Sequence, residues 1–392
     1  MNLSSDKGTL LLLGAAHSLN HSLFLVLPPL LDEISRDLNA SYQAIGVVAT
    51  IAFLIYGVGA LVGGPMSDRI GEVKVISLSI GLSGVATAVF LLPKSMTSFS
   101  AGMYLVAALA SFYHPTANTL ISKHFQENTG GAMGIHGAAG SLGQIFTPLV
   151  AFFLGKYFDW RLAFAFFGLI TAVTGLFLRR IPAPARLTGE KVSPLKILTV
   201  PNIWIIVLYN VFIGLLQRGF ELFFPTFLIV NRGFSGEMAA LASSAVLFFA
   251  VGGHLIGGWI TDRASPVRAV ILTSAGMVAG MLILLLFPFP TVGVVLFIVV
   301  FGVALYGHQP AMTTLTGKVA PRELTGAAYG LMFFFAFGLG SFSTTIVGYI
   351  ATAFDLEKAF WIMALLSCGT LAVALTLPRM MRRMQPPKIT TG

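Results

Sequence analysis

The chain has 392 residues, of which 56% are hydrophobic and only 10% are charged, and its formal net charge is +9. Soluble domains carry roughly 25% charged residues, so this composition excludes an ordinary soluble domain and indicates a membrane protein. The single cysteine, Cys368, excludes a disulfide framework and a cysteine-based metal site.

Twelve apolar segments are long enough to cross a bilayer, which takes about 20 residues each. Their centres lie near residues 20, 53, 83, 108, 142, 169, 214, 248, 277, 302, 338 and 367. The first segment, from about Thr9 to Leu31, is too long for a signal peptide and lacks a small-residue cleavage site. We therefore expect it to be a membrane span rather than a cleaved leader.

The longest polar connection, residues 179–200, is interrupted by prolines and divides the spans into two sets of six. We expect an N-terminal bundle over 1–178, a linker over 179–200, a C-terminal bundle over 201–378 and a tail over 379–392. Of the 24 lysines and arginines, 17 fall on the side that holds both termini and 6 on the other. Because basic loops stay in the cytoplasm, we predict cytoplasmic termini, linker and tail in an inner membrane. This bias explains the positive charge, so nucleic acid is not an expected partner.

The two halves of the sequence repeat each other in order. GPMSDR at 64–69 matches GWITDR at 258–263, and His114 matches His308 at the same offset of 194 residues. TGGAMG at 129–134 matches TGAAYG at 325–330, and FDWRLAFAFFGL at 158–169 matches FDLEKAFWIMAL at 354–365. Six spans return the chain to its starting side, so the repeats are parallel, and a shared site is expected between them near the bilayer midplane.

Twelve spans, two parallel halves and a Gly-x-x-x-Asp-Arg loop after the second and eighth spans resemble the major facilitator superfamily. The resemblance implies an all-α membrane protein with twelve transmembrane helices in two pseudo-symmetric six-helix bundles around a central cavity. It also implies a latch in the loops, and the matching residues are Gly64, Asp68, Arg69, Gly258, Asp262 and Arg263. A carboxylate there can face the positive N-terminal end of a helix.

A narrower resemblance rests on YHPTANTLISKHF and GGAMGIHGAAGSLGQIFTPL, which look like the fosmidomycin-resistance branch of that superfamily. The members of this branch are taken to be proton-driven exporters, which implies antiport, efflux and drug resistance. The antiporter motif of the fifth span is matched at Gly143 and Pro148 but not at Thr147, where the motif has glycine.

Two charges stand in the seventh span, Arg218 and Glu221, in the segment GLLQRGFELFF. A charge at mid-membrane is costly, so it normally faces a cavity or a partner. At i,i+3 the two side chains can form an ion pair, which is one interpretation. The other is a pair that also meets substrate and protons. Arginine keeps its proton at any relevant pH, so Arg218 suits an anionic group, while Glu221 could take up and release a proton.

Six of the seven histidines lie in or near spans. His114 precedes Pro115, and His308 stands two residues before Pro310. A proline inside a helix leaves a carbonyl without its usual donor, so we predict a bend at both stretches, with the histidine facing the cavity. The alternative is a histidine that bonds neighbouring helices together. We expect His136 and His254 to be structural.

His17 and His21 share a helix face at i,i+4 spacing, which can ligate zinc. No thiolate accompanies them, so metal or metal-chelate transport is an alternative and no metal site is assigned.

Without a P-loop, a His-Glu-x-x-His segment or a serine elbow, we expect no enzyme activity and no cofactor. The prediction is a proton-coupled secondary transporter that exports a small anionic or amphiphilic compound by alternating access, with protons, membrane lipid and that compound as partners, and a monomeric state. Proton-coupled uptake of an organic anion and a non-transporting receptor are the remaining alternatives. The predicted substrate-binding residues are Arg218, His114, His308, Tyr113, Asn118, Gln217, Tyr306, Gln309, Thr313 and His21. The predicted proton carriers are Glu221, His17, His21, His114 and His308.

Overall fold

The computed structural model describes residues 6–40, 42–183 and 193–384, and throughout that part of the chain the regular structure is helical. The predicted linker is therefore described only at its two ends, and the predicted tail only as far as Met384. The middle of the linker and residues 385–392 lie outside the described residues.

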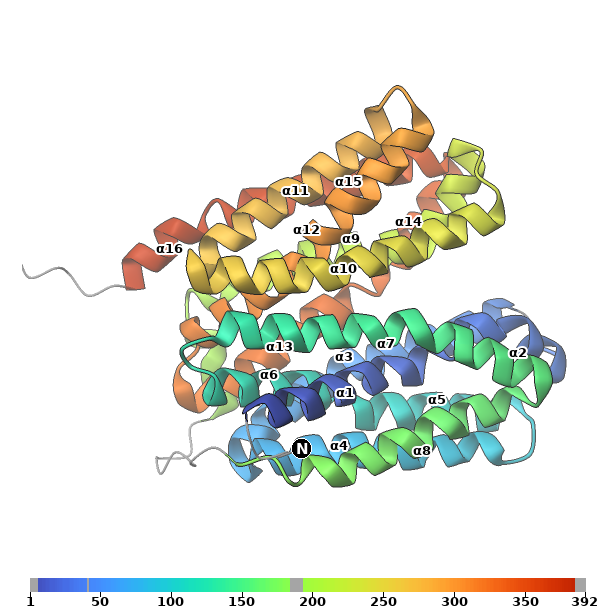
Figure 1. The fold of residues 1–392 in the computed structure, drawn as a ribbon, viewed down its shortest axis with the longest axis horizontal. Coiled ribbons are helices and arrows are strands. Elements are labelled where there is room, and N and C mark those ends of the chain that lie inside the picture. Colours follow the sequence, from blue (N-terminus) through green and yellow to red (C-terminus); the bar gives the residue numbers. More distant parts are fainter. Residues whose placement is uncertain (1–5, 41, 184–192, 385–392) are drawn as a thin grey trace, which may run out of the picture.

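The N-terminal half contributes six membrane-crossing stretches, which Figure 1 shows in blue to green in the lower part of the view. They are α1 (Asp6–Leu25), α3 (Tyr42–Ile70), α4 (Glu72–Ala86), the pair α5 (Met96–Ala110) and α6 (Tyr113–His124), α7 (Thr129–Tyr157) and α8 (Trp160–Leu178). A short helix, α2 (Leu31–Asp37), follows α1.

The C-terminal half repeats this order. Its stretches are α9 (Ile203–Arg232), α10 (Gly236–Arg263), α11 (Pro266–Leu286), α12 (Pro290–Val319), the pair α13 (Thr325–Phe333) and α14 (Phe342–Ala353), and α15 (Leu356–Ala374). A π-helical turn, Phe334–Leu339, separates α13 from α14. The last described helix is α16 (Leu377–Met384).

Nine of the described helical stretches are long and apolar enough to cross a membrane. The three other stretches are α1, α7 and the interrupted α13–α14. The first carries two histidines and an asparagine, the second is rich in glycine, and the third is broken by the π-helical turn. Polar and small residues are typical of membrane helices that pack closely on other helices. The chain is a multi-pass membrane protein.

Capping residues explain why the two halves share the sequence Phe-Asp. Asp159 accepts a hydrogen bond from the Arg161 amide at 2.9 Å and caps α8, and Asp355 accepts one from the Lys358 amide at 2.7 Å and caps α15. An aspartate at this position satisfies an amide that the first turn of a helix leaves free. The hydrogen bond from the Arg161 side chain lowers the pKa of the Asp159 carboxyl to about 2, so this cap stays ionised.

Glycines set how closely the helices pack. A β-carbon on Gly257 of α10 would stand 2.0 Å from the Gly307 carbonyl oxygen of α12, and one on Gly175 of α8 would stand 2.4 Å from the α-carbon of Gly81. Van der Waals contact between small residues is a main source of helix association in lipid. Each of these two pairs joins helices of the same half, so both help to build the separate bundles.

Replacement of Gly257 by alanine should lower stability by about 1–3 kcal/mol, because the added methyl group overpacks the contact between α10 and α12. The matched control is Gly252→Ala on the same helix, where a β-carbon would meet nothing within 4 Å. That change should be neutral or slightly stabilising, since alanine favours the helix by about 1 kcal/mol. Thermal unfolding in detergent measures both variants, and equal midpoints would contradict the packing argument.

Candidate functional site

A cavity of about 600 Å³ lies between the two halves. Residues of α1, α3, α5, α6 and α7 line it from one side, and residues of α9, α10, α12, α13 and the π-helical turn from the other. Among the described residues, none of α4, α8, α11 or α15 reaches it, and Figure 1 shows these four helices at the outer edges of the two bundles. The cavity extends to Leu27 and Ile45, near the end of α1 and the start of α3.

Most of the predicted substrate and proton residues line this cavity. They are His17, His21, His114, Asn118, Gln217, Arg218, Glu221, Tyr306, His308, Gln309 and Thr313. The predicted ionisable residues of the membrane spans therefore face the same cavity between the two halves.

The ion pair in α9 occupies the C-terminal side of the cavity. Arg218 donates from Nη1 to Oε2 of Glu221 at 2.7 Å, and the two side chains are 23% and 30% exposed. The other carboxylate oxygen, Oε1, accepts from Gln217 Nε2 at 2.7 Å and from the Tyr306 hydroxyl at 3.3 Å. Both residues meet the cavity, so the pair is accessible to a ligand as well as structurally satisfied.

Two phenylalanine rings flank the guanidinium of Arg218. The ring centre of Phe337, in the π-helical turn, lies 4.8 Å from its central carbon, and that of Phe53, in α3, lies 5.7 Å from it. The face of an aromatic ring attracts a cation. Phe337 also stacks on His114, with ring centres 5.6 Å apart. A single ring thus links the charged pair to the histidines.

Four histidines of the N-terminal half, His17, His21, His114 and His136, form one group. His17 Nδ1 lies 2.7 Å from the carbonyl oxygen of His136, and the two rings stack with centres 4.1 Å apart. His21 Nε2 lies 3.0 Å from His17 Nε2. The ring of His114 packs against both, 4.9 Å from that of His17 and 5.2 Å from that of His21. His136 and His254, which the sequence predicted to be structural, line the cavity too.

Tyr113, which was predicted to contact substrate, is fully buried and is not among the residues that line the cavity. Its hydroxyl donates to the Leu13 carbonyl at 2.6 Å and lies 2.9 Å from His136 Nε2. Neighbouring residues of a helix point about 100° apart, so Tyr113 cannot share the cavity face with His114. Tyr113 therefore holds α1, α6 and α7 together.

The two histidine–proline stretches differ. The helix is interrupted between Ala110 and Tyr113, which places Pro115 in the first turn of α6, where a missing amide hydrogen is tolerated. In the C-terminal half, α12 continues through Pro310 without interruption. His308 bonds through Nδ1 to the Leu305 carbonyl of its own helix.

Several cavity residues were missed by the sequence analysis. The Tyr56 hydroxyl donates to Asn20 Oδ1 at 2.7 Å, and Asn20 Nδ2 donates to the Ala110 carbonyl at 3.1 Å, directly before the break in the fourth stretch. Phe333 and Phe337 also line the cavity. Tyr56 is a polar residue in the otherwise apolar second span, and this could have identified it as a cavity residue. Phe333 and Phe337 could not be identified, because their segment contains several phenylalanines that look alike in the sequence.

Two aspartates join the halves at one end of the molecule, here called the latch end. Asp68 of α3 accepts from the amides of Gly326 and Ala327, at 3.1 and 3.2 Å, in the first turn of α13. Asp262 of α10 accepts from the amides of Gly130 and Gly131, at 2.9 and 2.6 Å, in the first turn of α7. Each aspartate thus caps a helix of the opposite half and meets the positive end of its dipole.

Glycines permit this approach. A β-carbon on Gly64 would stand 1.9 Å from the Gly326 carbonyl oxygen, and one on Gly258 would stand 2.5 Å from that of Gly130. Arg69 and Arg263, predicted as latch residues, are exposed and form no ion pair with the residues that the structure describes. Among the described residues, it is the carboxylates of Asp68 and Asp262 that accept the hydrogen bonds of the latch.

At the opposite end, the ion pairs between described residues each lie within one half. Asp37 pairs with Lys94, which lowers the pKa of the Asp37 carboxyl, and it also accepts from Trp160 Nε1 at 2.9 Å. Lys358 pairs with Asp355 in the other half at 2.8 Å. Because the cavity extends toward this end and the latch joins the halves at the other, the structure is closed at the latch end.

Two similar bundles surround a cavity that holds ionisable side chains, and they are joined at one end, which is the architecture of a secondary transporter. The sequence pattern of the Major Facilitator Superfamily matches residues 10–345, and the chain belongs to that family. It is 24% identical over 380 residues to the glycerol-3-phosphate transporter of Bacillus subtilis, covering 87% of this chain and 85% of the relative. It is 24% identical over 368 residues, 89% of each chain, to the probable nitrate/nitrite transporter NarK2 of Mycobacterium tuberculosis.

The fold is shared with solved structures of the family. The crystal structure of the Escherichia coli fucose:proton symporter FucP superposes with a TM-score of 0.78 at 16% sequence identity, covering 94% of this chain and 98% of that one. As a member of the Major Facilitator Superfamily, the protein is a transporter rather than an enzyme, and its substrate is a small molecule.

Loss of the latch carboxylates should open the latch end. A hydrogen bond to a charged group contributes about 1.5–3 kcal/mol, so the double variant Asp68→Asn, Asp262→Asn should shift the balance toward separated halves. Spin labels at Glu127 and Arg322, one in each half, with Cys368 replaced by serine, report the change as a longer distance population. Asp355→Asn, which removes a cap within one half, is the control. An unchanged distance distribution in the double variant would contradict the latch.

Proposed function

We propose that this chain transports a small anion together with protons, and that Arg218 and Glu221 perform the coupling. The observation that carries the proposal is the position of this ion pair. Both charges stand in a membrane-crossing helix, both are partly exposed, and both line the cavity between the halves. An intramembrane pair in such a place is by default part of a substrate or proton pathway.

Arg218 suits an anionic group. Its guanidinium carries five N–H donors in a planar fork that matches carboxylate and phosphate oxygens. Nη1 meets Glu221, which leaves donors for a substrate in the cavity. Two relatives support this reading, because the glycerol-3-phosphate transporter and the nitrate/nitrite transporter are named for anions.

The coupling follows from competition for the guanidinium. When a substrate anion binds Arg218, Glu221 loses its cation partner and keeps only the neutral donors Gln217 and Tyr306. A carboxylate in a cavity without a cation takes up a proton more readily. Anion binding and protonation therefore favour each other, and this linkage holds in both directions.

Positive linkage favours symport, in which proton and anion cross together. With an inward proton gradient this is uptake, the alternative named in the sequence analysis. Export by antiport needs substrate and proton to exclude each other, which a cationic or amphiphilic substrate at Glu221 would satisfy. The resemblance to the fosmidomycin-resistance branch predicts drug efflux by antiport instead. The transport assay below distinguishes antiport from symport.

The orientation, the oligomeric state and the roles of the other cavity residues are also part of the proposal. We expect both termini in the cytoplasm, which makes the latch end the cytoplasmic one, and a monomer that works without a cofactor. We propose that His308 carries protons in addition to Glu221. Asn118, Gln309 and Thr313 shape the substrate pocket.

Replacement of Glu221 by glutamine should abolish proton-driven accumulation while substrate exchange without a gradient continues, because glutamine mimics the protonated carboxyl. Proteoliposomes with labelled glycerol 3-phosphate, nitrate or a hexose phosphate measure both activities. For a symporter, an acid exterior drives accumulation, and an acid lumen does not. Accumulation driven by an acid lumen would establish antiport, and unchanged proton-driven flux in the variant would remove Glu221 from the mechanism.

Replacement of Arg218 by glutamine should weaken binding of the anion about 100-fold, since a charge-assisted hydrogen bond contributes about 3 kcal/mol. Ligand-induced thermal stabilisation over the same panel of anions measures this. Arg268→Gln, at an exposed arginine near the start of α11, is the matched control and should bind as the unaltered protein does. Equal stabilisation of the Arg218 and Arg268 variants would contradict an anion site at Arg218.

A further inference from the structure

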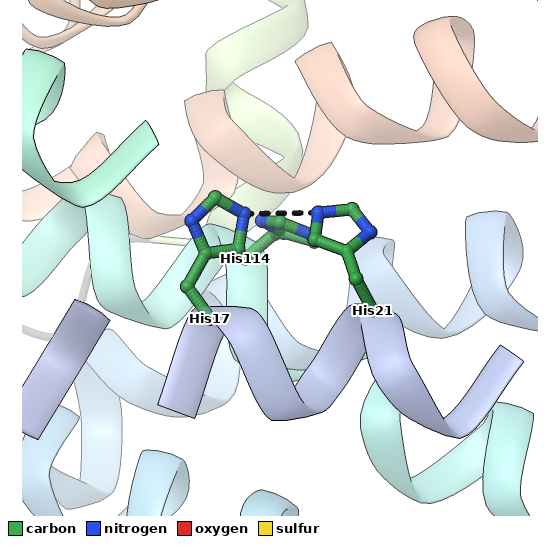
Figure 2. A group of neighbouring side chains, drawn as sticks. All are labelled: His17, His21 and His114. Atoms are coloured by element: carbon green, nitrogen blue, oxygen red, sulfur yellow. Dashed lines mark hydrogen bonds between the residues drawn. The ribbon is translucent and has the colours of Figure 1, made fainter. Parts of the chain in front are cut away.

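We propose that His17, His21 and His114 form a binding site for a divalent late transition-metal ion such as Zn²⁺, Ni²⁺ or Co²⁺. Figure 2 shows the three rings gathered on one side of α1. Their ligand nitrogens all lie within 4.8 Å of one another. This proposal does not depend on the anion site, because it concerns other residues and a different ligand.

Two of the rings are placed by one helix. His17 and His21 are four residues apart in α1, so both project from the same face. Their Nε2 atoms stand 3.0 Å apart. A zinc–nitrogen bond of about 2.0–2.1 Å with tetrahedral angles separates two ligand nitrogens by about 3.3 Å. The pair is thus within a few tenths of an ångström of chelating geometry.

The hydrogen bond on the far side of His17 fixes which nitrogen can ligate. A carbonyl only accepts hydrogen bonds, so the contact from His17 Nδ1 to the His136 carbonyl requires the proton on Nδ1. The lone pair is then on Nε2, which points toward His21. Histidines that bind metal commonly have their other nitrogen held by a carbonyl in this way.

The residue behind His17 is fixed in turn. The Tyr113 hydroxyl uses its only hydrogen on the Leu13 carbonyl. It can therefore only accept from His136, which must donate from Nε2 at 2.9 Å. The His136 ring, fixed in this way, stacks on the His17 ring with centres 4.1 Å apart and supports its orientation.

The third histidine has an unused nitrogen. His114 is 5% exposed, and its Nε2 has no hydrogen-bond partner among the described residues. A buried polar atom without a partner is destabilising, so such an atom calls for a ligand. The ligand nitrogens lie within 4.8 Å of one another, so a shift of about 1.5 Å in the His114 ring would bring all three to the separation of about 3.3 Å that a tetrahedral zinc ion needs.

The donor set selects the metal. Three imidazoles suit zinc, nickel, cobalt and copper, whereas magnesium and calcium require oxygen ligands. Three protein ligands leave a fourth position open, as in sites that exchange a bound group. Since His17, His21 and His114 all line the cavity, a small ligand can reach the ion.

Charge balance indicates what would fill the open position. Phe337 stacks on His114 and also covers the guanidinium of Arg218. A dication bound to His114 would therefore be separated from a fixed positive charge by the Phe337 ring. The two charges repel unless an anion lies between them. The metal would therefore be held together with an anionic ligand, and this second step does rest on the proposed function.

The rival use of the same residues is a proton relay, as the sequence analysis predicted for His17, His21 and His114. A relay needs the histidines to exchange protons and gives no stoichiometric affinity for metal. Direct metal binding to the purified protein therefore separates the two, and it needs no transport assay.

The test is titration of Co²⁺ into detergent-purified protein carrying a tag without histidine, followed by visible absorption of tetrahedral cobalt and by calorimetry with Zn²⁺. One ion per chain is expected. His21→Ala and His114→Gln should each weaken binding about 100-fold or more. Loss of a residue that only supports a metal ligand already costs up to about 100-fold, and these two variants remove a ligand itself. His124→Ala, at a histidine paired with Asp6 beyond the cavity, is the control and should bind normally.

Gel filtration and thermal unfolding establish that each variant is folded. If a triad variant fails to fold, protection of His21 in the unaltered protein from diethyl pyrocarbonate by Zn²⁺, read by mass spectrometry, replaces it. Absence of stoichiometric binding, binding equal in the triad variants and the unaltered protein, or equal loss in the His124 variant would each overturn the site.

Discussion

Hydrocarbon offers no hydrogen bonds, and this constraint determines where every polar group of the chain can lie. The ionisable side chains within the spans cannot face lipid, so they gather between the two bundles. The aspartates of the latch obey the same rule at the membrane edge, where the free amides of two helix starts become their partners. The cavity, its charged pair and its histidines are thus consequences of a single solvent condition.

The repeat in the sequence produces structural symmetry but not chemical symmetry. Asp159 and Asp355 cap matching helices, and Asp68 and Asp262 cap helices across the interface in matching ways. The site itself is divided by chemistry. Histidines cluster on the N-terminal side, and the fixed cation with its carboxylate stands on the C-terminal side. A cavity with unlike walls can hold a ligand in one orientation, which two identical walls could not specify.

Much of this arrangement could be predicted from the sequence, because the relevant signals are strong. Twelve apolar segments, repeats at a constant offset and charges within spans each have few physical interpretations. The features that could not be predicted depend on helix rotation or on neighbours. Tyr113 precedes a cavity histidine, yet the helical turn of about 100° points it into the bundle. The helix is interrupted before Pro115, whereas α12 continues through Pro310, and the two sequences do not show this difference. The contact of Phe337 with both Arg218 and His114 depends on the π-helical turn, which no sequence pattern indicated.

A transporter must separate its halves at one end without a large cost, and the latch is built for this. When Asp68 leaves α13, Lys123 stands 3.5 Å away within the same half and already pairs with Glu72 at 2.6 Å. Asp262 belongs to an exposed position where water can replace the amides of α7. Neither carboxylate is stranded without a partner, so opening exchanges one set of interactions for another of similar strength. The close glycine contacts within each bundle lie elsewhere and stay intact during that exchange. An exchange of this kind is what the rocking of two bundles about a central site requires.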